Sequence, residues 1–462
     1  MQEENIKEAF KGATGKEPYD YQERVFREIL NLSDSGGLIL VEAPTASGKT
    51  EAVVFPYLTQ HCLKTFPLAR RLIYVLPTRA LVNAQALRIK GHAEKLGLNL
   101  IVNIDHGAVQ SPTPMFYGDV VLTTWDAFLY GYAAQRTIGT RLTIPAGNLA
   151  VSLIVFDEVQ MYQDQDFYTP KLIGSIVNHF KDTGIPLLFM TATLPTRLRG
   201  ILGLSGTTPI SPLDSDAKKP LRGNVAVAIE KEKDILDVID ENRDTIEETI
   251  KRQEKVLIVT NTVKKAIDAC ESARLIEPGA ILLHSRLLAK TRRVREKQLI
   301  KGRFKVLVAT QVVESGLDIP KITFGIVEAA PPDGLIQRIG RIARRKNEQG
   351  QVTVVIPRDN GKIHFWPYLP LNEDGLKELE NEAKTNDQDT AIHKKLSSLS
   401  NFWNNLSEDS LHRALSSLEE SRRLLDSFYD QFEEQENGEE KPEKKSKAKR
   451  SKEKRKVSSG EN

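Results

Sequence analysis

Short apolar runs alternate with stretches of helical spacing along the first 200 residues of the chain. Patterns with the period of an amphipathic helix, such as residues 80–96 and 165–183, separate these runs. Strands that are buried on both faces appear as continuous apolar runs, so the pattern predicts a parallel sheet covered by helices on both sides. The predicted strands are 38–42 ("LILVE"), 72–76 ("LIYVL"), 100–104 ("LIVNI"), 119–123 ("DVVLT"), 151–156 ("VSLIVF") and 187–190 ("LLFM").

The same alternation restarts after residues 205–224, a stretch rich in Pro, Ser, Gly and Asp that is typical of a boundary loop. Helical patterns such as 263–274 and 289–301 lie between the new strands. We therefore expect an α/β protein with two tandem parallel-sheet domains, at residues 1–212 and 213–358. The predicted strands of the second domain are 255–260, 280–285, 305–310, 324–329 and 351–357.

The pattern changes again after Pro357. Residues 359–435 are expected to form a helical C-terminal region, whose clearest amphipathic stretch is 406–432, with Ser407 and Ser410 as candidate caps. Residues 436–462 carry many charges and few apolar side chains, so we expect a disordered charged tail. A solvated tail is the commoner interpretation of such a charge run, with weak nucleic-acid binding as the alternative.

Composition limits the possible classes of protein. The net charge of the 462 residues is only +3, so a nucleic-acid site would have to come from locally arranged groups. The two cysteines, Cys62 and Cys270, are too few for a disulfide framework or a four-cysteine metal site. We find no apolar run long enough to span a membrane and no apolar segment typical of a signal peptide, so we expect a cytoplasmic protein without membrane contact.

A phosphate-binding loop is indicated by "APTASGKT" at residues 43–50, directly after one predicted strand and before a helix. Backbone N–H groups of Thr45, Ala46, Ser47 and Gly48 would cradle phosphates at the helix N-terminus. Lys49 would reach the β- and γ-phosphates, and the Thr50 hydroxyl would bind Mg²⁺. Ala43 replaces the first glycine of the motif, which leaves an ordinary strand–helix turn as the alternative.

Two adjacent carboxylates, Asp157 and Glu158, end the buried strand "LIVF". Like charges at such a place are costly unless a positive charge lies opposite. Mg²⁺ held by Thr50, Asp157 and the phosphates of ATP would supply that charge, and Glu158 would then orient or deprotonate the attacking water. A pair of helix-capping carboxylates is the alternative.

Together with these motifs, eight further stretches resemble superfamily 2 helicases, which clamp ATP and a nucleic-acid strand between two RecA-like domains. Arg341 and Arg344 are three apart, as on one helical face, and the resemblance makes them arginine fingers that reach the γ-phosphate when the domains close. Arg338 has a plainer reading as a solvated, ion-paired or strand-contacting side chain. The eight stretches are "YDYQ" (19–22), "PTRALVNAQ" (77–85), "VLTTWD" (121–126), "TATLP" (191–195), "VTNTVKKA" (259–266), "HSR" (284–286), "ATQVVESGLDIP" (309–320) and "QRIGRIARR" (337–345).

The resemblance also assigns roles to single residues. It places Gln22 on the adenine base, Gln337 near the γ-phosphate, and Gly316 and Asp318 on the nucleotide, with Asp318 at the ribose. Gln160 is expected near Thr191 or Thr193, where the three would couple hydrolysis to strand movement. For the threonines of the strand-contacting set, capping of a strand end is an equally good interpretation. That set comprises Thr78, Arg79, Thr123, Thr124, Thr260, Asn261, His284 and Thr310, which would hold backbone phosphates without reading sequence.

The motifs "DEVQ" and "QRIGRIARR" depart from the DEAD-box RNA helicases and resemble the CRISPR-associated helicase of type I interference. This implies a 3′-to-5′ single-stranded-DNA translocase in antiviral defence, recruited by an RNA-guided surveillance complex. The fused form of that family begins with an HD nuclease domain, but this sequence has no His-Asp dipeptide. We therefore expect a stand-alone subunit that works with a separate HD nuclease. The alternatives are a general RNA helicase and a scaffold or annealing protein with a vestigial ATPase.

Overall fold

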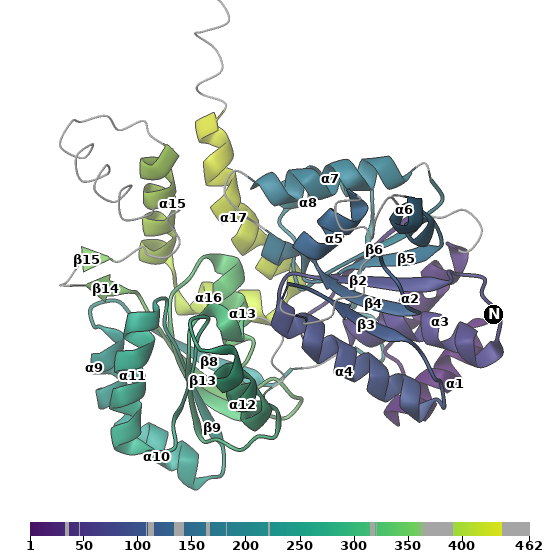
Figure 1. Cartoon of the computed structure of the whole chain (residues 1–462). Coiled ribbons are helices and arrows are strands. Elements are labelled where there is room, and N and C mark those ends of the chain that lie inside the picture. Colours follow the sequence, from purple (N-terminus) through teal and green to yellow (C-terminus); the bar gives the residue numbers. More distant parts are fainter. Residues whose placement is uncertain are drawn as a thin grey trace, which may run out of the picture.

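The computed structural model describes residues 1–32, 37–45, 47–107, 109, 115–133, 143–162, 167–181, 183–219, 222–314, 319, 321–359, 362–363 and 391–436. Two parallel sheets stand side by side, each covered by helices on both faces (Figure 1). This confirms the expected pair of tandem α/β domains. Within the described ranges, no helix is long and apolar enough to cross a membrane.

The sheet of the first domain has the strand order β3-β4-β2-β5-β6-β1-β7, and all its pairings are parallel. Since parallel strands share one carboxyl edge, the residues after β1 and β5 meet at the same edge. The strands are β1 (Gly37–Glu42), β2 (Arg71–Leu76), β3 (Val102–Asp105), β4 (Val120–Thr124), β5 (Ser152–Phe156), β6 (Pro186–Thr191) and β7 (Pro209–Ile210).

Helices cover both faces of this sheet. On one face, α2, α3 and α4 enclose a core that includes Tyr21, Val53 and Val82, and on the other α5 and α7 enclose one with Phe128 and Val177. α3 is buried from Lys49 to Gln60, whereas the other helices leave a side to solvent. The helical elements are α1 (Glu3–Thr14), α2 (Asp20–Asn31), α3 (Lys49–Leu63), α4 (Arg79–Lys95), α5 (Trp125–Tyr132), α6 (Thr143–Ala150), the 3₁₀ turn η1 (Val159–Tyr162), α7 (Tyr168–Lys181) and α8 (Thr196–Ile201).

The sheet of the second domain has the order β10-β11-β9-β12-β13-β8, again with parallel pairings only. Its elements are β8 (Asn224–Glu230), α9 (Ile235–Glu241), α10 (Arg243–Lys251), β9 (Lys255–Val259), α11 (Val263–Ile276), β10 (Ile281–Leu283), α12 (Ala289–Ile300), β11 (Val306–Ala309), η3 (Gln311–Val313), β12 (Ile322–Glu328), α13 (Pro332–Ile339) and β13 (Gln349–Val355), followed by the small hairpin β14 (Arg358–Asp359) and β15 (Lys362–Ile363).

Four strands of the described residues were not predicted: β7, β8 and the two strands of the small hairpin, β14 and β15, the second of which lies in the region 359–435 that was expected to be helical. β7 lies inside the expected boundary loop and extends the first sheet beside β1. β8 begins where that loop ends and forms an edge of the second sheet. Residues 225–229 of this strand are a continuous apolar run, but they directly follow the expected boundary loop, and of the strand only Val225 is buried.

The C-terminal helices pack onto the second domain. They are α15 (Ala391–Asn405), α16 (Glu408–Ser416) and α17 (Leu418–Glu436), and the chain turns between the last two at Ser417. Ser407 caps α16 by accepting a hydrogen bond from the Ser410 N–H, as the sequence predicted. Trp403 is fully buried in the same core as Leu335 of α13, and its indole N–H donates to the Ala330 carbonyl at 3.1 Å. The predicted tail beyond residue 436 lies outside the described residues.

Candidate nucleotide and nucleic-acid site

The predicted phosphate loop follows β1 and leads into α3 at Gly48. Gly48 has φ +88°, and a Cβ atom there would lie 2.6 Å from Nε2 of Gln22, so glycine is required on both grounds. Lys49 opens α3 and donates from Nζ to the carbonyls of Ala43 at 2.7 Å and Pro44 at 3.1 Å. Burial lowers the pKa of this ammonium group, and the charges of Glu158 and Asp157 oppose that shift.

Asp157 follows β5 and faces the start of α3. Its carboxylate accepts hydrogen bonds from the Tyr74 hydroxyl and from the N–H of Glu158, both at 2.8 Å. Burial raises the pKa of Asp157 to about 7, and the neighbouring Glu158 charge acts in the same direction. Nearby, the Thr50 hydroxyl accepts a hydrogen bond from Gln85 of α4 at 3.0 Å. Two carboxylates in such surroundings fit a divalent cation, because it would offset both the burial and the repulsion.

A short relay leads from the acidic pair to the end of β6. Nε2 of Gln160 donates to the Glu158 carboxylate at 2.6 Å, and Oε1 of Gln160 accepts from the Thr191 hydroxyl at 2.7 Å. That hydroxyl also lies 3.0 Å from the carbonyl of Thr193. Gln160 therefore contacts Thr191, as the sequence predicted, and its role in coupling stays a prediction.

Both predicted arginine fingers face the phosphate loop across the domain boundary. A cavity of about 680 Å³ lies between the domains. The arginines nevertheless do not share a helical face, because α13 ends at Ile339 and they lie on the turns that follow it. The cavity is lined by Lys16, Tyr19, Thr45, Gly48, Lys49, Thr50, Leu81, Gln85, Arg88, Asp157 and Glu158 of the first domain and by Arg341, Arg344, Arg345 and Lys346 of the second.

Two further polar residues of the arginine motif, Gln337 and Arg338, are buried, whereas Arg345 is exposed. Gln337 is 6% exposed on α13 and is not one of the described residues that line the cavity. Arg338 is fully buried and forms an ion pair with Glu314 at 2.7 Å. It also donates to Oδ1 of Asn261 at 2.7 Å, and the side-chain amide of Asn261 donates to the Ala329 carbonyl at 2.9 Å. Of the readings for Arg338, the structural ion pair is the one observed, and Asn261 directs its side chain inside the domain.

The segment 19–22, which was predicted to read adenine, contacts the predicted phosphate loop directly. Gln22 accepts a hydrogen bond from the Tyr19 N–H at 2.8 Å and donates to the Gly48 carbonyl at 2.8 Å. Tyr19 itself lines the cavity, together with Gln85 and Arg88 of α4. The sequence reasoning did not single out these three, although Tyr19 and Gln85 belong to quoted motifs. Ala46, Gly316 and Asp318 lie outside the described residues.

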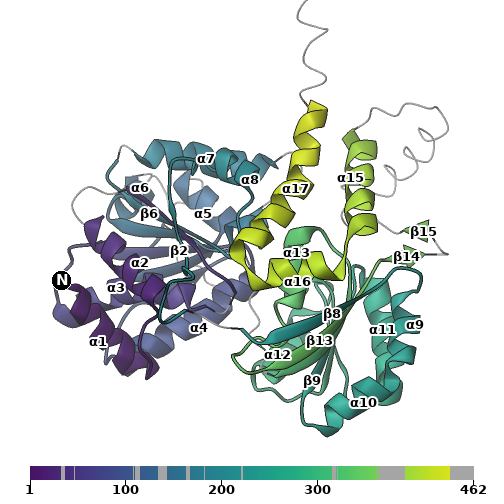
Figure 2. The ribbon, with the colours of Figure 1, turned by 180° about the vertical axis from the view of Figure 1, so that it is seen from behind.

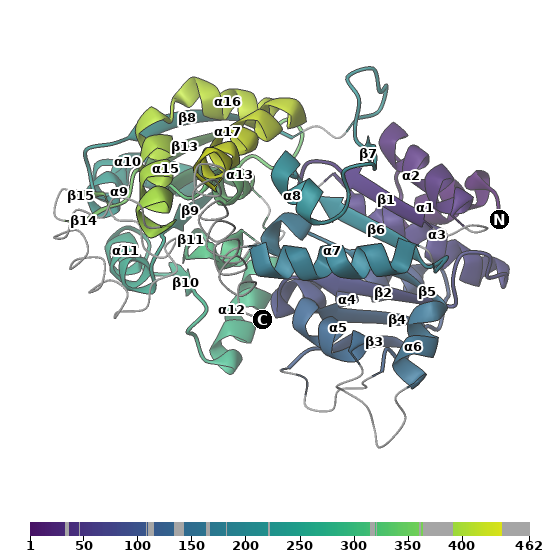
Figure 3. The ribbon, with the colours of Figure 1, turned by 90° about the horizontal axis from the view of Figure 1, so that it is seen from above.

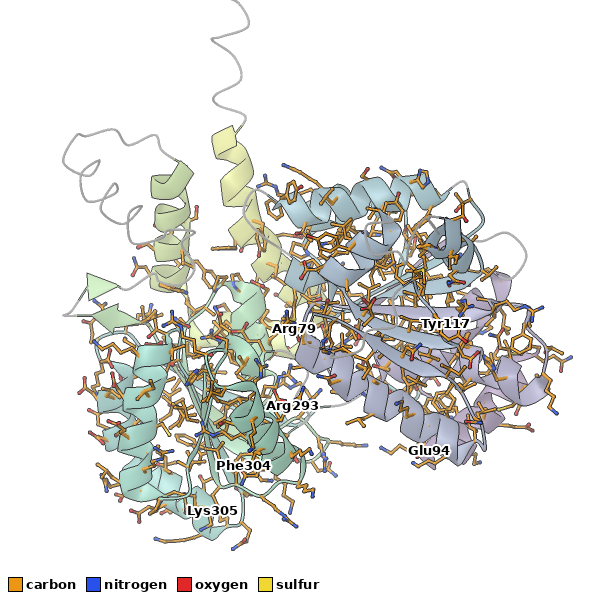
Figure 4. The ribbon with its side chains drawn as sticks, viewed as in Figure 1. Arg79, Glu94, Tyr117, Arg293, Phe304 and Lys305 are labelled. Atoms are coloured by element: carbon orange, nitrogen blue, oxygen red, sulfur yellow. The ribbon has the colours of Figure 1, made fainter. Side chains whose placement is uncertain are left out.

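The predicted strand contacts are spread over both domains. Thr78 caps α4 by accepting from the Leu81 N–H at 3.3 Å, which agrees with its capping interpretation. Arg79 and Arg293 lie on facing sides of the domain boundary (Figure 4). Burial lowers the pKa of His106, and both arginines act in the same direction, so cations of both domains meet there. Arg293 was missed because α12 has no clear apolar face. The remaining predicted contacts, Thr123, Thr124, Thr260, His284 and Thr310, are buried at or next to strand ends.

Comparison with known proteins supports the resemblance. Residues 19–201 match the DEAD/DEAH box helicase family, and residues 252–347 match the C-terminal part of the CRISPR-associated nuclease/helicase Cas3. The chain is 33% identical over 333 residues to the CRISPR-associated helicase Cas3 of Thermoproteus tenax, which covers 69% of this chain and 55% of the relative. It is 26% identical over 335 residues to DDX49 of Mus musculus, which is named as an ATP-dependent RNA helicase, and this covers 70% of the chain and 66% of the relative.

The fold agrees with a solved helicase structure. The crystal structure of T. fusca Cas3 with AMPPNP has a TM-score of 0.63 and 19% identity, and it covers 91% of this chain and 53% of that one. The chain spans about half the length of the curated CRISPR-associated relatives that it matches. The chain thus has the fold of two RecA-like domains, of which the first matches the DEAD/DEAH box helicase family and the second matches the C-terminal part of CRISPR-associated nuclease/helicase Cas3.

Proposed function

We propose that this chain is an ATP-dependent translocase that moves 3′ to 5′ on single-stranded DNA and unwinds target DNA in type I CRISPR interference. We further propose that it acts with a separate HD nuclease after recruitment by an RNA-guided surveillance complex. One observation carries the proposal. A single cavity joins Lys49, Asp157 and Glu158 of the first domain to Arg341 and Arg344 of the second. Hydrolysis in a cavity split in this way can be linked to relative domain movement.

Each group in the cavity has a role in phosphoryl transfer. Lys49 would leave its two carbonyl partners and pair with the β- and γ-phosphates of ATP. Glu158 would orient or deprotonate the attacking water, and Arg341 and Arg344 would stabilise charge on the transferred phosphoryl group. Thr50 and Asp157 would hold Mg²⁺, which supplies charge neutralisation at the phosphates when it is bound.

Strand contacts in both domains would turn domain closure into movement. Arg79, the first residue of α4, and Arg293 of α12 would hold backbone phosphates on either side of the boundary. Closure with ATP and opening after hydrolysis would shift one set of contacts relative to the other. The relay through Gln160 and Thr191 would carry the state of Glu158 to the end of β6.

ATP turnover measured with single-stranded DNA, single-stranded RNA and no nucleic acid tests this proposal. We expect DNA to stimulate turnover more than RNA does. Lys49→Ala should abolish unwinding, because removing even a single hydrogen-bond donor that stabilises transition-state charge typically costs a factor of about 10²–10³ in rate. Stimulation by RNA without stimulation by DNA would contradict the CRISPR assignment, and full unwinding by Lys49→Ala would contradict the mechanism.

A second candidate function is that of a general RNA helicase. It is favoured by the similarity to DDX49, which extends over a larger share of that relative than of the Thermoproteus tenax protein. The nucleotide cavity would operate in the same way in both cases. The comparison of DNA with RNA described above distinguishes the two functions.

A further inference from the structure

The last helix, α17, is anchored in the second domain and lies against the first (Figures 2 and 3). Leu425 and Phe428 are buried in the core of the second domain, which also contains Leu335 of α13. The ring of Phe428 packs against Phe402 of α15 with 5.4 Å between centroids. Because these contacts are apolar and buried, α17 should move with the second domain when the domains open or close.

The polar side of α17 contacts the first domain. Arg422 forms an ion pair with Glu42, and Asp426 accepts hydrogen bonds from the N–H and the hydroxyl of Thr196 at 2.7 and 2.9 Å. Arg422 and Asp426 are four residues apart and therefore lie on one face of the helix. Thr196 opens α8, so the Asp426 carboxylate also occupies the position of an N-terminal helix cap.

Glu42 connects these contacts to the phosphate loop. It is the last residue of β1, its side chain is 2% exposed, and the loop begins immediately after it. One of its carboxylate oxygens accepts the N–H of Leu194 at 3.0 Å, and the other pairs with Arg422. A buried carboxylate needs such partners, so Arg422 helps to fix Glu42 and, through it, the segment 191–196.

We infer that Arg422 and Asp426 are positioning residues that link the second domain to the relay from Glu158. The contacts are continuous. Glu158, Gln160 and Thr191 are joined by hydrogen bonds, and residues 194 and 196 of the same segment are held by Glu42 and α17. Movement of the second domain would reach the segment 191–196 through α17. This inference rests on the proposed function, and it gives the C-terminal helices a role in coupling ATP hydrolysis to unwinding.

Arg422→Gln in the full chain tests the inference, with Arg423→Gln as the matched control. Arg423 is the next residue of α17, but it pairs with Glu419 and Glu420 of its own helix. We expect Arg422→Gln to leave the KM for ATP within about twofold and to lower the base pairs unwound per ATP about 10-fold, within the range of measured coupling effects. Arg422→Lys should restore part of this ratio, and Arg423→Gln should behave as the parent protein.

Two results would overturn the inference. One is that unwinding and ATP turnover in Arg422→Gln both stay at the level of the parent protein. The other is an equal loss of both activities, which would show a structural role alone. If Arg422→Gln does not fold, Asp426→Ala is judged by the same two criteria, because it removes the neighbouring contact to Thr196.

A closure measurement separates this inference from the proposed function. Dyes on Cys62 of the first domain, which is exposed, and on Leu275→Cys of the second would report domain closure on binding AMPPNP, whether or not the chain unwinds DNA. We expect Arg422→Gln to bind AMPPNP normally and to show at most about half of the parent's change in energy transfer. The same change in both proteins would overturn the inference even if the chain proves to be an active helicase.

Discussion

Gln160 donates a hydrogen bond of 2.6 Å to the carboxylate of Glu158. The other end of the same side-chain amide accepts from the Thr191 hydroxyl, so both ends of Gln160 are fixed. Glu158 itself has φ +50°, a backbone conformation that is uncommon for a residue with a side chain. The candidate water-activating carboxylate is thus held by its own backbone and by a relay that ends on β6.

We expect Gln160→Ala to separate ATP hydrolysis from unwinding. The substitution removes both hydrogen bonds of the relay but leaves Lys49, Glu158 and the arginines in place. Base pairs unwound per ATP should fall by about 5- to 150-fold, which corresponds to a coupling free energy of about 1–3 kcal/mol. Parallel assays of ATP turnover and strand separation measure the ratio, and Gln351→Ala, at an exposed position of β13, is the control. An unchanged ratio would remove Gln160 from the coupling path.

Glu158→Gln should bind ATP and hydrolyse it poorly. The oxygen of the new amide can still accept the hydrogen bond from Gln160, so the side chain should keep its position. The amide cannot, however, take a proton from the attacking water. Loss of a general base typically costs a factor of about 10²–10⁴ in rate. Fluorescent-nucleotide binding and single-turnover hydrolysis measure the two effects separately. Unimpaired hydrolysis in this variant would show that the general-base assignment is wrong.

Arg344→Gln should remove a trans-domain contribution to hydrolysis. Arg344 lines the cavity together with Lys49 and Glu158 of the first domain. An arginine finger contributes about 10³–10⁵ to the rate, so turnover should fall by orders of magnitude while ATP still binds. Arg252→Gln, at an exposed arginine of the same domain that pairs with Glu248, should have no effect. If the rate of ATP turnover fell by less than tenfold in Arg344→Gln, Arg344 would not be the arginine finger.

Much of the fold and the phosphate loop could be predicted because their signals are local. Strands buried on both faces leave uninterrupted apolar runs such as "LIVF", and the loop motif fixes the positions of Gly48, Lys49 and Thr50. The edge strand β8 was missed although residues 225–229 are all apolar, and only Val225 of it is buried. The proposed helical face of Arg341 and Arg344 was wrong because α13 ends before either residue, and sequence spacing does not show where a helix stops.

The long-range contacts could not be predicted from the sequence. Arg422 and Glu42 are 380 positions apart, and neither lies in a motif that names the other. The partners of Asn261 and Arg338 are also set by packing, since both side chains lie inside the second domain. Such pairs depend on how the domains and the C-terminal helices assemble, and no local sequence pattern indicates this assembly.

Asp157→Asn should raise the concentration of Mg²⁺ that ATP turnover requires. The substitution removes a negative charge beside Thr50 and keeps the hydrogen-bond acceptor for Tyr74. Loss of a residue that only hydrogen-bonds to a metal ligand lowers metal affinity by about 10- to 100-fold. For the proposed ligand Asp157 itself, we therefore expect the half-saturating Mg²⁺ concentration to rise by at least about 10-fold. EDTA should abolish turnover of the parent protein. Asp240→Asn, at an exposed aspartate on α9, is the control, and an identical Mg²⁺ dependence of Asp157→Asn would rule out its role as a ligand.

Trp403→Ala should destabilise the second domain, although residue 403 lies outside both sheets. Its side chain is fully buried in the core that also contains Leu335, and its indole N–H is bonded to Ala330. Replacing a buried tryptophan by alanine typically costs about 3–5 kcal/mol of the free energy of unfolding. Urea unfolding followed by far-UV circular dichroism measures this, with Asn404→Ala, the exposed next residue of α15, as the control. If the two variants unfolded at the same urea concentration, α15 would not be part of that core. A loss of stability in Trp403→Ala but not in Asn404→Ala would show that the C-terminal helices are part of the core of the second domain. The burial of Leu425 and Phe428 of α17 in the same core leads to the same expectation.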